Sequence, residues 1–238
     1  MKSSAGKSYL SFILIAGMFA LLSAIIIPFI GTKTQCGPRG ADASNIRQIA
    51  QSCLIYAMSH NDRLPEATDV WDFARQLAES GGLESASLWI SRQDPANEDM
   101  SDTPKTVLLP GDIPPHQIDP KFLQLKPWIA VPLGKLNNSM PATTPVAWTR
   151  GLQPDGTWAK HSPYGNEGGY VAFVGGNVIF YKNLKSNGGE LLRFDGTGKT
   201  SNILEALPPG CRIGEYVPTP AEQLAWAKQS KATSPQAR

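Results

Sequence analysis

Three histidines are the residues best suited to acid–base or metal chemistry, and their spacing favours neither. They are His60, His116 and His161. No two of them are four residues apart, and none lies beside a cysteine at the spacing of a zinc site. A catalytic triad is not local in sequence, but the G-x-S-x-G turn of one hydrolase class does not occur in this chain. We therefore expect loop or surface histidines, no metal, no cofactor and no catalysis.

The stretch at residues 195–201, D-G-T-G-K-T-S, is similar to the end of a phosphate-binding loop. Such a loop needs a glycine five residues before Gly198, and this chain has Arg193 there. Without that glycine the backbone cannot curl its amide groups around a phosphate. We expect a turn at this position and no nucleotide.

Acidic residues gather between positions 94 and 112, and together they could bind Ca²⁺, which prefers several oxygen ligands from a flexible loop. The residues are Asp94, Glu98, Asp99, Asp102 and Asp112. Their spacing is not that of an EF-hand. A solvated loop is therefore the expectation, with calcium binding as the alternative.

Basic charge is concentrated at the beginning of the chain. Lys2, Lys7, Lys33 and Arg39 are the only charged side chains in residues 1–40, which leaves 18 of the 22 basic residues against all 20 acidic ones. A nearly neutral domain lacks the basic face of a nucleic-acid-binding protein, so we expect no nucleic acid partner.

The three cysteines, Cys36, Cys53 and Cys211, leave the disulfide question open. An odd number does not make a complete disulfide framework. One disulfide with a free thiol and three free thiols are both compatible with the sequence, and Cys53 could pair with either of the others.

Residues 9–30 form an apolar run without a charged side chain. As a helix it would be roughly 33 Å long, enough for a hydrocarbon core of about 30 Å. The run exceeds the apolar region of a signal peptide, and the nearest A-x-A, at residues 41–43, lies well beyond it. We therefore expect a transmembrane anchor in contact with membrane lipid, preceded by a short basic leader at residues 1–8.

The rest of the chain predicts an α+β domain at residues 43–217, between a Gly/Pro hinge at 31–42 and a polar tail at 218–238. Apolar spacing predicts helices over 43–59 and 68–80, and a short helix near 221–227. Strands are predicted at 128–131, 146–149, 170–174 and 178–182. The last two are separated by Gly175-Gly176-Asn177, a hairpin signal.

Several motifs resemble the type IV pilin family, most closely the pseudopilins of type II secretion. Gly6 matches the glycine that ends the family's leader, and counting from Lys7 puts Pro28 at position 22, where the family often has proline. S-N-I-R-Q-I at 44–49, Y-A at 56–57 and N-D-R-L-P at 61–65 resemble the S-N-L-K-Q-I, Y-A and N-x-G-x-x-P motifs of one bacterial subgroup. T-P-V-A-W-T-R-G-L at 144–152 and G-G-Y-V-A-F at 168–173 resemble that subgroup's C-terminal hairpin.

Two positions depart from the family pattern. Lys7 stands where the family has an aromatic residue, and Ser11 stands where it has glutamate. That glutamate is the one charge within the apolar helix, and it pairs with the amino terminus of a neighbouring subunit. Ser11 cannot supply this pairing. Cleavage between Gly6 and Lys7 is thus a hypothesis that the rest of the resemblance implies.

The resemblance implies an α+β, pilin-like fold in which a long transmembrane helix continues into a periplasmic helix, packed on a small antiparallel sheet. It implies a non-catalytic structural protein of the bacterial inner membrane, with a cytoplasmic N-terminus and a periplasmic domain. Its partners would be other pilin-like subunits or the secretion machinery of a type II secretion or pilus-like assembly. Close helix packing in the membrane would use Ser11, Ala16, Gly17, Ala20, Ala24 and Pro28. The alternative, favoured by Lys7 and Ser11, is a stand-alone anchored binding domain that is neither processed nor assembled.

Overall fold

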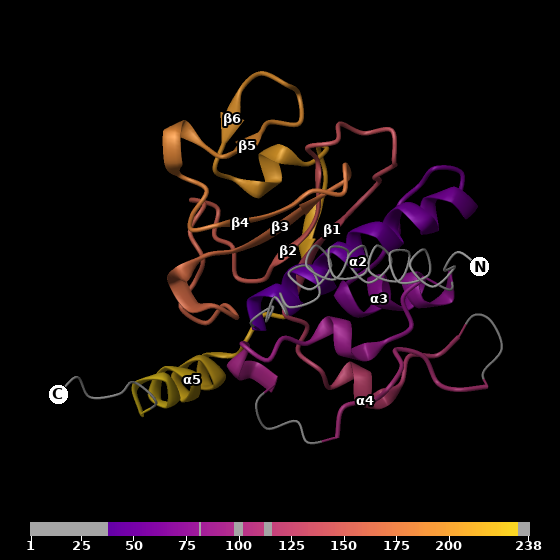
Figure 1. Ribbon diagram of the computed structural model, residues 1–238, viewed down its shortest axis with the longest axis vertical. Helices are drawn as coiled ribbons and strands as arrows, with labels where there is room; N and C mark the ends of the chain where they lie inside the picture. Colours follow the sequence, from indigo (N-terminus) through magenta and orange to yellow (C-terminus); the bar gives the residue numbers. More distant parts are fainter. Residues whose placement is uncertain (1–37, 81, 98–101, 112–115, 233–238) are drawn as a thin grey trace, which may run out of the picture. The chain divides into compact units, whose positions relative to one another are not determined.

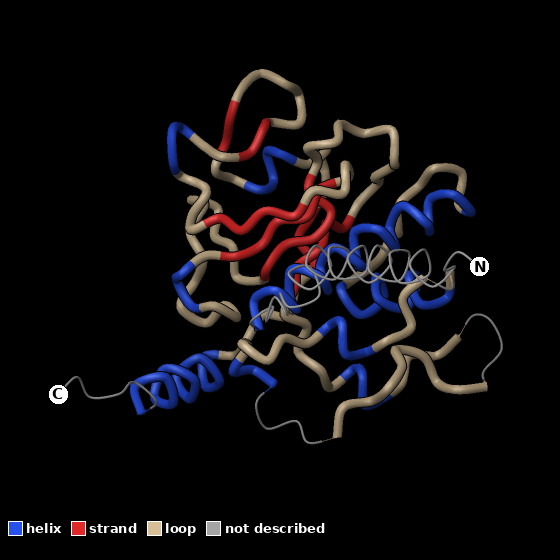
Figure 2. Tube along the Cα trace, in the orientation of Figure 1, coloured by secondary structure: helices blue, strands red, loops and turns tan. Residues whose placement is uncertain are grey.

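A five-stranded antiparallel sheet organises the part of the chain that the computed structural model describes, residues 38–80, 82–97, 102–111 and 116–232. Its strand order is β4-β3-β2-β1-β7 (Figures 1 and 2). The strands are β1 (Ile129–Leu133), β2 (Pro145–Thr149), β3 (Gly169–Phe173), β4 (Val178–Tyr181) and β7 (Arg212–Gly214). Strand β1 pairs with β2, β2 with β3 and β3 with β4, and β7 returns to pair with β1. Together with its helices, this sheet makes the described part of the chain an α+β structure.

Two neighbouring helices pack on this sheet. Helix α2 (Pro38–Ser59) contacts β2 and β3, and α3 (Val70–Glu79) contacts both β1 and α2. Helix α2 begins with Pro38, a residue favoured at the first helical position because it lacks an N–H and has a fixed φ. Helix α3 begins after Asp69, whose side chain accepts a hydrogen bond of 2.8 Å from the backbone N–H of Asp72.

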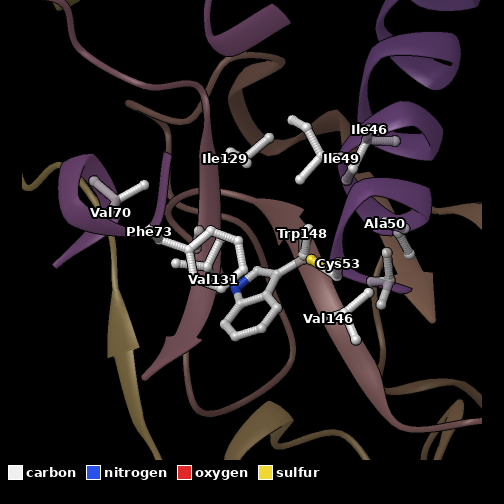
Figure 3. Packing of buried hydrophobic residues seen from close by; sticks show 14 of the residues in the cluster. Ile46, Ile49, Ala50, Cys53, Val70, Phe73, Ile129, Val131, Val146 and Trp148 are labelled. Carbon is white, nitrogen blue, oxygen red and sulfur yellow. The ribbon is translucent and has the colours of Figure 1, made fainter. Parts of the chain in front are cut away.

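The core lies between these helices and the sheet and continues across the sheet. Figure 3 shows apolar side chains from α2, α3, β1 and β2 gathered in this core, including Ile49, Phe73, Val131 and Trp148. Every residue of β1, β2 and β3 is buried, so the central strands are covered on both faces. Trp158 supplies part of the cover: a Cβ added to Gly169 would lie 2.5 Å from its ring.

A smaller lobe follows the main sheet in sequence. Strands β5 (Leu191–Leu192) and β6 (Lys199–Thr200) pair with each other, and the short helix η5 (Ile203–Ala206) packs on both. The remaining elements connect or flank these parts. They are η1 (Ala86–Trp89), η2 (Pro95–Asn97), α4 (Pro120–Leu123), η3 (Gly165–Glu167), η4 (Ser186–Gly188) and α5 (Pro220–Ala232).

The predicted elements agree with the structure except at their ends. All four predicted strands are present, and Gly175-Gly176-Asn177 joins β3 to β4 as expected. The helix predicted to begin at Ala43 begins five residues earlier, because Pro38 suits a first turn and Asp42, near that turn, is held by buried partners. Strand β3 is buried along its whole length, since both of its faces are covered. Helix α5 is longer than the predicted 221–227.

The predicted fold class needs a correction. Among the described residues no helix is both long and apolar enough to cross a membrane, which contradicts a transmembrane helix that continues into the domain helix. Helix α2 is an amphipathic helix of the domain, since exposed polar residues such as Arg47 and Gln48 lie between its buried ones. The predicted anchor at 9–30 and the leader lie outside the described residues.

Candidate functional site

Buried polar side chains converge on the loop at residues 91–97, which runs into η2. Ser91 and Asp94 are both buried, and the backbone N–H of Asp94 donates to the Ser91 carbonyl over 3.2 Å. Ser91 reaches Asp42 at the start of α2, while Asp94 reaches Arg150 just after β2. One short loop therefore connects two separate buried charges.

The first centre fixes the beginning of α2. Asp42 is 3% exposed, and its Oδ2 accepts hydrogen bonds from Ser91 Oγ at 2.5 Å and from the Tyr164 hydroxyl at 2.7 Å. The Tyr170 hydroxyl donates to the Arg39 carbonyl over 2.9 Å. We name these five residues, Arg39, Asp42, Ser91, Tyr164 and Tyr170, the N-terminal clamp.

Aromatic rings surround the polar contacts of the clamp. Tyr164, Tyr170 and Phe180 meet edge to face, with ring centroids 5.0 to 5.9 Å apart. The Arg39 guanidinium lies 5.8 Å from the Tyr164 ring and 5.5 Å from the Phe180 ring, and it also forms an exposed ion pair with Glu167. The clamp thus joins the first turn of α2 to β3, β4 and the segment between β2 and β3.

Burial governs the electrostatics of the clamp. It raises the pKa of the Asp42 carboxyl, although the Ser91 and Tyr164 hydroxyl groups act in the opposite direction. It also raises the pKa of the Tyr164 hydroxyl, and the nearby Asp42 adds to that rise. The tyrosine therefore stays protonated at neutral pH and remains a hydrogen-bond donor to Asp42.

The second centre is an ion pair buried beneath the end of the sheet. The side chains of Arg150 and Asp94 are 1% and 0% exposed, and Arg150 Nη2 bonds to Asp94 Oδ1 at 2.5 Å. Arg150 Nη1 also donates to the His161 carbonyl over 3.2 Å. Within the described residues, Asp94 Oδ2 and Arg150 Nε lack a hydrogen-bond partner. This pair is therefore incompletely satisfied, unlike the Asp42 oxygen with its two donors.

Charge balance keeps the second centre ionised. Burial raises the pKa of Asp94, and the Arg150 guanidinium opposes that rise. A guanidinium does not lose its proton in proteins, so a protonated Asp94 would leave a buried cation without a counter-charge. We therefore treat the two side chains as an ion pair at neutral pH.

The chain after β7 covers this ion pair. The rings of Tyr216 and Trp226 lie 5.7 and 5.6 Å from the Arg150 guanidinium. The same two rings lie 5.8 and 5.6 Å from the Lys126 ammonium. Lys126 also pairs with Glu222 at 2.7 Å, and the Tyr216 hydroxyl donates to Glu222 over 2.6 Å. Two cations of the body are thus enclosed by two aromatic rings of the C-terminal segment.

None of the three histidine side chains takes part in either centre. His60 stacks on Tyr56 after α2, His116 lies in the loop before α4, and His161 contributes only its carbonyl to Arg150. Burial, together with the Arg150 charge, lowers the pKa of the His161 imidazole. Over the described ranges, no three of the His, Cys, Asp or Glu side chains are placed to hold a metal ion together.

The acidic loop differs from the expectation at its first residue. The prediction that Asp94 is solvated is wrong, because its carboxylate is buried in an ion pair with Arg150. Asp102 is exposed and pairs with Lys121. Glu98, Asp99 and Asp112 lie outside the described residues.

The other sequence motifs have plain structural outcomes. The 195–201 stretch begins with the expected turn, which leads into β6, and Asp195 accepts hydrogen bonds from the backbone N–H and hydroxyl of Thr197. Cys53 and Cys211 are both free thiols, and burial raises the pKa of Cys53 to about 12. Cys36 lies outside the described residues, as do the predicted cleavage and helix-packing positions. Those positions are Gly6, Lys7, Ser11, Ala16, Gly17, Ala20, Ala24 and Pro28.

Sequence reasoning missed the residues that build both centres, above all Asp42, Ser91 and Arg150. One signal was available, because Arg150 directly follows an apolar strand and a charge in that position is placed to be buried at the sheet's end. Compared with known proteins, the chain matches no family model, and neither a curated protein nor a solved structure is significantly similar to it.

Proposed function

We propose that this chain is a non-catalytic structural subunit, a component or relative of a type II secretion or pilus-like assembly. The described domain is the rigid head of that subunit. Its role is to present a preformed domain, beginning at Pro38, to the other subunits of the assembly. The proposal combines the resemblance of the motifs at 44–49 and 61–65 with the way the head holds its own first helix.

The N-terminal clamp is the observation that supports this role best. A structural subunit needs a domain that keeps its shape, and this requires that the first helix of the domain is held at its start. Asp42 ties the start of α2 to Ser91 and Tyr164, and Tyr170 ties the Arg39 carbonyl to β3. An intramolecular hydrogen bond typically stabilises a fold by about 0.5–1.5 kcal/mol, and a buried carboxyl group that lost its donors would cost more. The first turn, normally the part of a helix that frays, is thus among its most strongly held parts.

A second candidate is a stand-alone binding domain that is not processed or assembled. Lys7 and Ser11 favour it, because they replace the residues on which processing and packing of pilin-like subunits depend. In that function the clamp would only stabilise the domain, without transmitting a position to neighbours.

Intact mass separates the two candidates. The full chain is expressed in a bacterium together with a prepilin peptidase, purified from the cells and weighed by mass spectrometry. A structural subunit is expected to lose residues 1–6 and to carry a methyl group on Lys7. Gly6→Leu is the matched control, since it changes only the residue that the peptidase is expected to require.

A full-length, unmethylated chain would contradict the structural-subunit proposal and favour the binding domain. Loss of residues 1–6 in both the natural chain and Gly6→Leu would contradict it as well, because the cut would then come from another protease.

A further inference from the structure

The C-terminal segment differs from the rest of the domain in how it is attached. Helix α5 lies at the periphery, with only one end against the body (Figures 1 and 2), and its packing partner there is η2. Two apolar side chains of this segment face solvent: Val217 is 70% and Leu224 65% exposed. Its attachment therefore depends on contacts other than a shared apolar core.

We propose that residues 216–226 form a releasable strap, which closes over the Arg150–Asp94 ion pair through Lys126 and opens as a unit about Glu215. This inference does not depend on the proposed function. It concerns a conformational equilibrium of the domain, and it rests on three features of the closed state.

The first feature is that the strap is organised largely by itself. Glu222 Oε2 accepts hydrogen bonds from the Tyr216 hydroxyl at 2.6 Å and from the N–H and hydroxyl of Thr219 at 2.8 Å. Thr219 in turn caps α5, with its hydroxyl accepting from the Glu222 N–H over 3.3 Å. This is a capping box, a local arrangement that does not need the body of the domain.

The second feature is that the strap meets the body mainly through two cations. The Tyr216 ring also meets Trp71 of α3 edge to face, with ring centroids 6.5 Å apart. Lys126 forms an ion pair with Glu222 in which both side chains are 27% exposed, and it faces the rings of Tyr216 and Trp226. Partly exposed ion pairs and cation–π contacts are weak, salt-sensitive interactions. Lys126 itself is fixed from the body side, because Asn97 accepts from its N–H over 3.1 Å and donates to its carbonyl over 2.8 Å.

The third feature is the state of the ion pair under the strap. Asp94 Oδ2 and Arg150 Nε have no hydrogen-bond partner among the described residues, and both are buried. A buried polar atom without a partner costs free energy that water would return on exposure. Lifting the strap hydrates both atoms, and this gain offsets part of the free energy needed to detach the strap from the body. The closed state is thus poised close to an open one.

Glu215 marks the fixed end of the strap. Its carboxylate accepts a hydrogen bond of 2.8 Å from the Gly151 N–H, and its pKa is raised by burial. The preceding strand β7 is paired with β1 through three residue pairs. The Gly151 amide therefore reports whether opening stops at Glu215 or continues into the sheet.

Amide hydrogen exchange resolved by NMR on the full chain tests the strap. An isolated helix of the 13 residues of α5 is marginal in water, so a lifted strap loses amide protection. We expect the amides of 221–226 to exchange about tenfold faster in Lys126→Gln than in the natural chain, with the Gly151 amide and those of α2 unchanged. Lys185→Gln, which removes another exposed lysine of an ion pair, is the matched control and leaves the strap unchanged.

The expected result includes a salt effect, since raising ionic strength should accelerate exchange in 221–226 of the natural chain but not in Lys126→Gln. Three outcomes would overturn the proposal. The strap could exchange as slowly as α2 in both chains, Gly151 could lose protection together with the strap, or Lys185→Gln could open the strap as much as Lys126→Gln.

Discussion

The two buried carboxylates that meet the 91–97 loop are used in opposite ways. Asp42 accepts two hydroxyl groups on one oxygen, and the aromatic rings of the clamp close around it. Asp94 has a full counter-charge in Arg150 but keeps one oxygen without a partner among the described residues. The first is held by neutral donors that are part of the core, and the second is covered by a segment that meets the body through cation contacts.

This difference explains why the start of α2 is held tightly and the C-terminal strap is held weakly. A buried charge costs free energy unless its hydrogen-bonding groups are satisfied, even where an opposite charge lies beside it. A satisfied carboxylate can fix a helix start, as Asp42 does for α2. An ion pair with unsatisfied polar atoms gains free energy when water reaches it. The strap that covers it is therefore the part of the domain that we expect to open first.

The largest expected effect comes from breaking the ion pair. Arg150→Met leaves the Asp94 carboxylate buried without a counter-charge, which typically costs about 3–5 kcal/mol of unfolding free energy. Urea unfolding followed by circular dichroism measures it. The double variant Arg150→Met/Asp94→Leu, which removes both charges, should recover most of the loss.

The control for this prediction is Arg193→Met, which removes an ion pair with Glu205 whose side chains are 41% and 40% exposed. Its cost should stay under about 1 kcal/mol. An equally small cost for Arg150→Met would mean that the pair is hydrated already, and the contrast between the two carboxylates would fail.

An intermediate effect is expected at the clamp, and its dependence on pH has a definite sign. Because burial raises the pKa of Asp42, protonation favours the folded state. The contribution of Asp42 to stability is then fully present below its unfolded pKa, about 3.9, and falls as the pH rises through the folded pKa. Asp42→Asn does not titrate, so its cost, about 1–2 kcal/mol, should be larger at pH 4 than at pH 7.

Asp72→Asn is the matched control with the opposite sign. Partial burial would raise the pKa of Asp72, but hydrogen bonds from the Thr68 backbone and from Arg75 outweigh it and lower the pKa. The stabilisation from Asp72 is present above its unfolded pKa, about 3.9, and is lost as the pH falls through the lower folded pKa, so its substitution should cost more at pH 7 than at pH 3. The same sign for both variants would contradict the account of the clamp.

The sequence predicted the parts of this contrast that are local. Apolar runs before Arg150 and after Gly168 identified β2 and β3, and Gly175-Gly176-Asn177 identified the turn between β3 and β4. These signals are contained within a few neighbouring residues, where backbone preference and burial agree. The helix start at Pro38 could also have been predicted from proline's preference for the first turn.

The two centres could not be predicted because their partners are distant in sequence. Arg150 lies 56 residues from Asp94, and Tyr164 lies 122 residues from Asp42. Neither pairing can be inferred from the residues next to it in sequence. An acidic loop is predicted to be solvated as long as the basic partner of its carboxylate, here Arg150, is unknown. Strand β7 was not predicted for a related reason. Arg212–Gly214 has no strand pattern of its own, and it is a strand because it pairs with β1.

The smallest effect on global stability is expected at Glu222, and it decides whether the two ends really differ. The hydrogen bond from Lys126 lowers the pKa of Glu222 to about 2, so the stabilisation from its ionised form is present above the unfolded pKa of about 4.3 and disappears as the pH falls toward 2. If the strap opens before the domain unfolds, this stabilisation belongs to the strap alone. Glu222→Gln should then change the free energy of global unfolding by less than about 0.5 kcal/mol, while amide exchange in 221–226 accelerates several-fold. A cost in global unfolding free energy as large as that of Asp42→Asn would show that the strap unfolds together with the clamp. The proposed difference between the two ends would then be wrong.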